Sequence, residues 1–179
     1  MYNDLEQILF SKEQIAKRVK ELGRQLSEDY AGKTPIFVCI LKGSSLFFSD
    51  LVKEITVPIT FDFMSISSYG GGTVSSGQVK LIKDLDSSIE NRHVVIVEDI
   101  VDTGHTLSYL IKNLQVRKPA SVKICTLLNK ECRREANLKP DYVGFDVDNY
   151  FVVGYGLDYD EAYRNLPEVG VLKPEIYTK

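Results

Sequence analysis

The chain has 179 residues, of which 44% are hydrophobic and 26% charged, and its formal net charge is −3. This length suits one domain with its own core, and the composition is that of a globular protein. The acidic balance gives no general attraction to nucleic acid or to an anionic membrane, and no apolar run is long enough to span a bilayer. Three cysteines without a CxxC pair, and an N-terminal stretch that is not typical of a signal peptide, predict a reducing, cytoplasmic location.

The first elements predict a helix followed by a strand–helix unit. Ser11 and Gln14 have the spacing of a capping box, and apolar residues then recur at helical spacing until near Gly32. Residues 35–41 (PIFVCIL) predict a buried strand of the parallel type, and residues 47–55 an amphipathic helix. This order predicts an α/β fold with a parallel sheet.

A glycine- and serine-rich stretch, residues 67–78, separates predicted strands at about 58–66 and 78–86. A loop of this length in a compact domain is usually functional or disordered. We therefore expect a long hairpin-like excursion here. Further strands are predicted at 121–130 and 142–147.

The chemistry is concentrated after a β-branched run at residues 94–97 (VVIV), which predicts a strand buried on both faces. Glu98 and Asp99 follow it directly, then Asp102, and residues 103–106 (TGHT) lead into a helix. Backbone N–H groups, threonine hydroxyls and a helix dipole bind phosphate. Carboxylates beside such a site fit a ligand that brings a divalent metal or hydroxyl groups.

This stretch resembles the ribose-phosphate signature of the phosphoribosyltransferases, and nearly the whole chain is similar to bacterial hypoxanthine (or hypoxanthine/guanine) phosphoribosyltransferases. The motifs match in order over about residues 38–165. The resemblance implies the type I phosphoribosyltransferase fold: an α/β protein with a parallel sheet of about five strands, flanking helices, a small hood and a mobile active-site loop. It implies a single domain, 1–179, with the core at about 33–150, the hood formed by about 1–10 and 151–179, and the loop at about 67–80.

The implied reaction transfers the 5-phosphoribosyl group of 5-phospho-α-D-ribose 1-diphosphate to hypoxanthine, and also to guanine, giving IMP or GMP and diphosphate. Asp102 matches the general base that removes a proton from the purine ring; a role as helix N-cap is the structural alternative. His105 occupies the variable position of the motif and is given no catalytic role. The residues implied for the ribose and its 5′-phosphate are Glu98, Asp99, Asp102, Thr103, Gly104, His105 and Thr106.

The other implied sites lie on segments far apart in the chain. In the family, the segment matching Leu41-Lys42-Gly43 often contains a non-proline cis peptide. The implied diphosphate-binding residues are Lys42, Gly43, Ser68, Tyr69 and Arg164. The implied purine-binding residues are Lys130, which donates to the purine O6, Phe151, which stacks on the base, Val152 and Asp158. The implied ligands of Mg²⁺ are Glu98, Asp99 and Asp158.

Two alternatives remain open at this stage. One is a phosphoribosyltransferase for another base, xanthine or a pyrimidine. The other is a non-catalytic, nucleic-acid-binding regulator with the same fold. Asp102, Lys130 and Phe151 favour an enzyme for 6-oxopurines, but they do not separate hypoxanthine from guanine. We expect small-molecule substrates, no nucleic-acid or membrane partner, and a homodimer or homotetramer.

Overall fold

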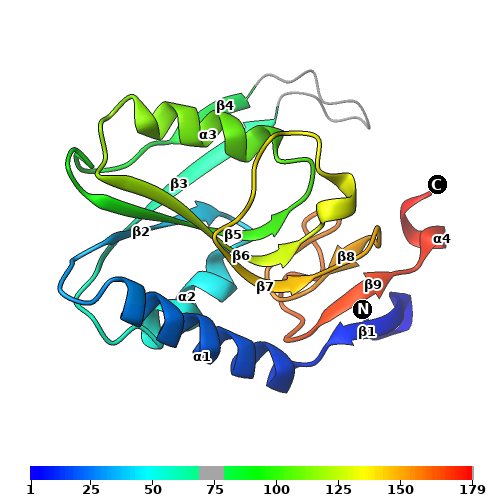
Figure 1. Ribbon diagram of the computed structural model, residues 1–179. Coiled ribbons are helices and arrows are strands. Elements are labelled where there is room, and N and C mark those ends of the chain that lie inside the picture. Colours follow the sequence, from blue (N-terminus) through cyan, green and yellow to red (C-terminus); the bar gives the residue numbers. More distant parts are fainter. Residues whose placement is uncertain (69–78, 179) are drawn as a thin grey trace.

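A six-stranded sheet in the order β4-β3-β2-β5-β6-β7 forms the centre of the computed structural model, which describes residues 1–68 and 79–178 (Figure 1). The strands are β2 (Ile36–Leu41), β3 (Thr60–Ser68), β4 (Val79–Lys83), β5 (His93–Val101), β6 (Ser121–Asn129) and β7 (Tyr142–Asp146). Neighbouring strands from β3 to β7 pair in parallel, and β4 pairs antiparallel with β3. The predicted parallel sheet of five strands is confirmed, with the returning strand as an antiparallel sixth.

Strand β5 shows why this sheet is buried on both faces. Val95 and Val97 belong to one core cluster, whereas Val94 and Ile96 belong to the other, and all four side chains are fully buried. Successive side chains of a strand point to opposite faces, so an unbroken β-branched run supplies both cores.

Helices cover both faces of the sheet (Figure 1). The face with α1 (Lys12–Asp29) and α2 (Ser45–Lys53) contains one cluster, and α3 (His105–Gln115) covers the other. The predicted capping box is confirmed: Ser11 Oγ accepts from the Gln14 N–H at 3.3 Å, and Gln14 Oε1 accepts from the Ser11 N–H at 2.8 Å. These bonds satisfy N–H groups that have no partner inside the helix.

A small antiparallel sheet, which we call the hood, lies at the carboxyl ends of the parallel strands (Figure 1). Its order is β1-β9-β8, formed by β1 (Leu5–Phe10), β9 (Val169–Leu172) and β8 (Val152–Val153). The short helices are η1 (Tyr2–Asp4), η2 (Glu131–Arg133) and α4 (Pro174–Tyr177). The predicted hood is thus confirmed. None of the helices in the described ranges is long and apolar enough to cross a membrane.

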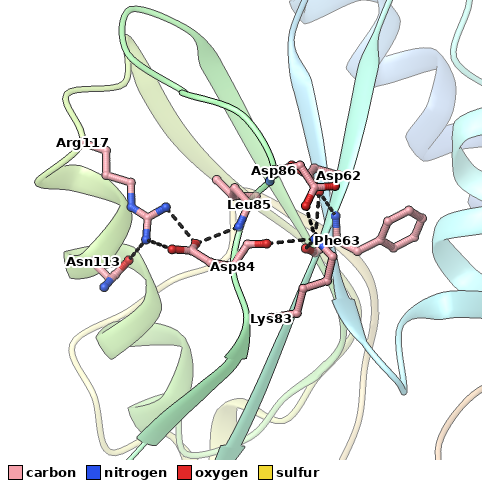
Figure 2. A network of polar contacts seen from close by, with 8 residues as sticks. All are labelled: Asp62, Phe63, Lys83, Asp84, Leu85, Asp86, Asn113 and Arg117. Carbon is pink, nitrogen blue, oxygen red and sulfur yellow. Dashed lines mark hydrogen bonds and ion pairs between the residues drawn. The ribbon is translucent and has the colours of Figure 1, made fainter.

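A polar network fixes the base of the β3–β4 pair (Figure 2). Asp62, which is 5% exposed, accepts from the Asp86 N–H at 2.7 Å and lies 3.4 Å from Lys83 Nζ. Asp84 forms two hydrogen bonds of 2.8 Å with Arg117, just beyond the end of α3. The network therefore joins the edge of the sheet to the helix that follows the predicted phosphate loop.

Candidate active site

The loop between β5 and α3 begins after Val101, later than the sequence predicts. Strand β5 continues beyond the predicted residues 94–97, so Glu98 and Asp99 lie within the strand. Helix α3 has Gly104 at its N-cap position, in the left-handed region with φ +83°. The N-cap alternative for Asp102 is therefore wrong. A glycine at this position avoids the steric cost that a side chain meets at positive φ.

A pocket of about 130 Å³ lies where β5 meets α3. It is lined by Glu98, Ile100, Val101, Asp102, Thr103, Gly104, Thr106 and Leu107. Five of these lining residues are among those predicted for ribose and phosphate, while Ile100, Val101 and Leu107 were not predicted. Asp99 and His105 are not in its lining, and His105 Nε2 instead lies 2.7 Å from Glu135 Oε2 at the surface. N–H groups in the first turn of α3 have no acceptor within the helix, which suits an anion at this end.

The Asp102 carboxylate has acceptor capacity that the protein does not use. Its Oδ1 atom is buried and has no hydrogen-bond partner among the described residues. Arg133 Nε lies 3.2 Å from Oδ1 without hydrogen-bond alignment, and Lys130 Nζ lies 3.9 Å from Oδ2. Buried acceptors are normally paired, so an unpaired one beside a pocket is suited to a ligand N–H.

Arg134 holds the loop in place and was not predicted. Its guanidinium donates to the carbonyls of Asp102 at 2.8 Å and Val101 at 2.9 Å, and to Asn129 Oδ1 at 2.7 Å. The Thr103 carbonyl also accepts two N–H groups from the segment just after Arg134. In the sequence, Arg134 is one of several charges in a short polar segment, and only the fold brings it under this loop.

Burial perturbs the two neighbouring carboxyl groups. It raises the pKa of Glu98 well above its usual range, and the charge of Asp99 adds to the effect. Burial likewise raises the pKa of Asp99 to about 6, opposed by the Ile100 N–H and by Arg164. A Cβ at Gly43 would collide with the Asp99 carboxylate, so glycine there allows this close approach. A buried and a partly buried carboxyl group with raised pKa values are suited to a cation.

This shift predicts how the stability of the metal-free protein depends on pH. A carboxyl group whose pKa is raised by folding stabilises the fold below its unfolded value, 3.8 for Asp99, and this contribution is lost as the pH rises through about 6. As the pH rises from 5 to 7.5, the free energy of unfolding of Asp99→Asn should therefore increase by about 1–2 kcal/mol relative to that of the wild type. Urea denaturation of both proteins at several pH values, in the presence of a chelator that keeps them metal-free, would measure this difference. Asp148→Asn, at an exposed position, is the control; an equal gain there would contradict the assignment.

The predicted purine residues meet at the start of β8. Lys130 is only 6% exposed, burial lowers its pKa, and its Nζ donates to the Tyr150 carbonyl at 2.8 Å. Phe151 follows Tyr150 and is 37% exposed. The structure therefore places an ammonium group at the backbone carbonyl of the residue that precedes a partly exposed aromatic ring.

The backbone of Val152 faces the open side of the hood. The Leu172 N–H donates to the Phe151 carbonyl, which makes these two residues a hydrogen-bonded pair across β8 and β9. Such pairs alternate along antiparallel strands, so the N–H and C=O of Val152 point away from β9. Since β8 is the edge strand, these groups can contact a ligand.

The predicted diphosphate residues that follow β2 contact the segment between β8 and β9. The Leu41–Lys42 peptide is cis, and Lys42 Nζ lies 3.0 Å from Glu161 Oε2. A Cβ at Gly156 would collide with the Gly43 carbonyl. The two turns are therefore in direct contact.

Arg164 and Asp158 are paired with each other. Arg164 Nη2 lies 2.9 Å from Asp158 Oδ1, and its Nη1 donates to the Gly156 carbonyl at 2.8 Å. The Nε atom is buried without a partner in the part of the chain that the structure describes. Tyr69 lies outside the described residues, as do the side chain of Ser68 and most of the predicted mobile loop.

Comparison with known proteins identifies this arrangement. The model of the phosphoribosyl transferase domain matches residues 6–160. The chain belongs to the phosphoribosyltransferase family. It is 57% identical over 176 residues to a hypoxanthine-guanine phosphoribosyltransferase of Streptococcus thermophilus, covering 98% of each chain. The corresponding protein of Bacillus subtilis is 54% identical over 177 residues, 99% of this chain and 98% of that one.

A crystal structure supports the same relationship. A hypoxanthine phosphoribosyltransferase of Staphylococcus aureus superposes with a TM-score of 0.97 at 54% identity, covering 100% of this chain and 97% of that one. Within the family, the chain is therefore a member of the bacterial hypoxanthine-guanine phosphoribosyltransferases, which are enzymes of purine salvage. The predicted family and type I fold are confirmed.

Proposed function

We propose that the chain transfers the 5-phosphoribosyl group of 5-phospho-α-D-ribose 1-diphosphate to hypoxanthine and guanine, giving IMP or GMP and diphosphate. The observation that carries this proposal is that Asp102, Lys130 and the backbone leading to Phe151 lie together at one end of the sheet. There, the Asp102 carboxylate has one oxygen, Oδ1, without a hydrogen bond from any described residue, and its other oxygen, Oδ2, lies 3.9 Å from the buried ammonium of Lys130. Lys130 in turn donates to the carbonyl of Tyr150, the residue before Phe151. A proton acceptor, a donor for an oxo group and a stacking ring are what a 6-oxopurine requires.

In this proposal each group of residues has one task. Asp102 removes the proton from the purine ring nitrogen, Phe151 stacks on the base, and the backbone of Val152 contacts its edge. Glu98 and the turn from Thr103 to Thr106 hold the ribose and its 5′-phosphate. Lys42, Gly43, Ser68, Tyr69 and Arg164 bind the diphosphate. Closing such a site against water prevents hydrolysis of the activated ribosyl centre.

The acidic residues fit a magnesium ion that arrives with the substrate. Enzymes of this family typically use Mg²⁺. No group of three His, Cys, Asp or Glu side chains within residues 1–68 and 79–178 is arranged to hold a metal. Mg²⁺ commonly binds one or two carboxylates together with substrate phosphates, and we propose that its protein ligands are drawn from Glu98, Asp99 and Asp158. When bound, it neutralises charge on the leaving diphosphate.

The choice of base is tested by an assay of hypoxanthine, guanine, xanthine, adenine and uracil in parallel, with Mg²⁺ and the ribosyl diphosphate. We expect turnover of hypoxanthine and guanine, with adenine inert. Preferred use of xanthine or uracil would favour a phosphoribosyltransferase for another base. Binding of the ribosyl diphosphate without turnover of any base would favour the non-catalytic regulator.

Replacing Lys130 tests the recognition of the purine O6. Lys130→Met removes the ammonium but keeps a long side chain, and a hydrogen bond from a charged donor is worth about 1.5–3 kcal/mol. We expect kcat/KM for hypoxanthine to fall by about 10- to 150-fold, while the KM for the ribosyl diphosphate is retained. Lys123→Met, which removes an exposed lysine from β6, the strand that ends just before Lys130, should leave both values unchanged. Unaltered kcat/KM in Lys130→Met would contradict the assigned role.

We also propose that the protein acts in the cytoplasm as a homodimer or homotetramer. For the oligomer, one place to look for a subunit contact is the aromatic group formed by Phe48, Phe61 and Phe63, in which Phe61 remains 55% exposed at the surface. In a Trypanosoma cruzi relative, the C-terminal region has a role in the oligomeric state and enzymatic activity. Light scattering of the purified protein would give the oligomeric state.

A further inference from the structure

The platform proposed for the purine is itself stacked on a residue from the end of the chain. The rings of Phe151 and Tyr177 have centroids 4.6 Å apart and planes inclined by 18°, which is parallel stacking. Tyr159 meets Phe151 edge-on, at 5.6 Å and 84°. Phe151 nevertheless stays 37% exposed. One ring face is therefore occupied by Tyr177, and part of the ring remains open to a ligand.

The backbone around α4 fixes the position of Tyr177. The Leu172 N–H donates to the Phe151 carbonyl at 2.8 Å, and the Lys173 N–H donates to the Asp4 carbonyl at 2.9 Å. Lys173 Nζ also donates to the Asn3 carbonyl at 2.8 Å. These bonds tie the segment that carries Tyr177 both to the purine platform and to the start of the chain. The stack is thus set by tertiary structure.

We propose that Tyr177 is a positioning residue for the purine base, which rests on the function proposed above. It holds the Phe151 ring from behind, so that the base, Phe151 and Tyr177 form a stack of three rings. A half-exposed phenyl ring without this support would have to be ordered when the base binds, at a cost in affinity. In the part of the chain that the structure describes, Tyr177 forms no hydrogen bond or ring stack with the ribose-phosphate loop or with Lys42, Gly43 and Arg164, so the effect should be confined to the base.

Steady-state kinetics of three variants test the proposal. Tyr177→Ala should raise the KM for hypoxanthine about two- to tenfold, the range expected for one aromatic pair, while kcat and the KM for the ribosyl diphosphate are unchanged. Tyr177→Phe keeps the ring and should behave as the wild type. Tyr109→Ala removes an exposed tyrosine from α3 and should also behave as the wild type.

A direct binding measurement separates the base from the rest of the nucleotide. The chain has no tryptophan, so Tyr177→Trp places its only indole against Phe151. Titration with IMP should change the indole emission, whereas ribose 5-phosphate, which lacks the base, should not. Calorimetric titration with IMP should give a Kd that is two- to tenfold higher for Tyr177→Ala than for the wild type.

These experiments distinguish a failure of the inference about Tyr177 from a failure of the proposed function. An active Tyr177→Ala variant with unchanged KM for hypoxanthine and unchanged Kd for IMP would overturn this inference alone. A lower KM in Tyr177→Ala would also overturn it, since Tyr177 would then compete with the base. If the wild type neither turns over a purine nor binds IMP, the proposed function fails and the inference fails with it.

Discussion

Asp102→Asn is expected to lower turnover by roughly 10²- to 10⁴-fold, the effect of losing a general base. The amide has nearly the shape of the carboxylate but cannot take a proton from the purine ring. The loop should keep its structure, because Arg134 and Lys130 contact it through the backbone carbonyls of Asp102 and Val101. Binding of the ribosyl diphosphate should therefore persist.

Single-turnover kinetics with hypoxanthine, alongside a titration with the ribosyl diphosphate, would measure both quantities. Asp148→Asn removes the same charge from an exposed position and should change turnover by less than about twofold. If Asp102→Asn turned over hypoxanthine at the wild-type rate, Asp102 would not be the base. A combined loss of turnover and of ribosyl-diphosphate binding would indicate damage to the loop.

Asp62→Ala is expected to lower the free energy of unfolding by about 2–4 kcal/mol, because it leaves buried polar groups without partners. Asp62 accepts from the backbone N–H groups of Phe63 and Asp86, both at 2.7 Å, and contacts Lys83 Nζ (Figure 2). These donors belong to the edge of the sheet, where alanine offers no acceptor. Urea denaturation monitored by circular dichroism would give the difference.

Asp86→Ala is the matched control for this network. Its carboxylate also contacts Lys83, at 2.9 Å, but its side chain is 78% exposed. Exposed ion pairs contribute about 0–1 kcal/mol, so the loss in this variant should be small. Equal destabilisation by the two substitutions would show that burial of Asp62 does not determine its contribution.

The elements that could be predicted from the sequence are those in which local pattern and tertiary role agree. The apolar run at 94–97 predicts a strand with two buried faces, and its alternate residues do lie in two different cores. Strand ends also predict a common edge, because parallel strands end on the same side of a sheet. Asp102 and Lys130 directly follow the neighbouring strands β5 and β6. This shared edge, together with the family resemblance, allowed both residues to be assigned to one site before the structure was known.

What could not be predicted depends on contacts between distant segments. The start of α3 at Gly104 rather than Asp102 follows from backbone conformation, which the surrounding polar residues do not determine. Arg134 stabilises the loop only because β6 returns beside β5. The stack of Tyr177 on Phe151 joins two segments whose sequences carry no sign of each other.

The strand order of the hood has a consequence for the newly made chain. Its middle strand, β9, is synthesised well after the ribose-phosphate loop, which follows β5. On the ribosome the phosphate site can form while the wall of the base pocket is still missing.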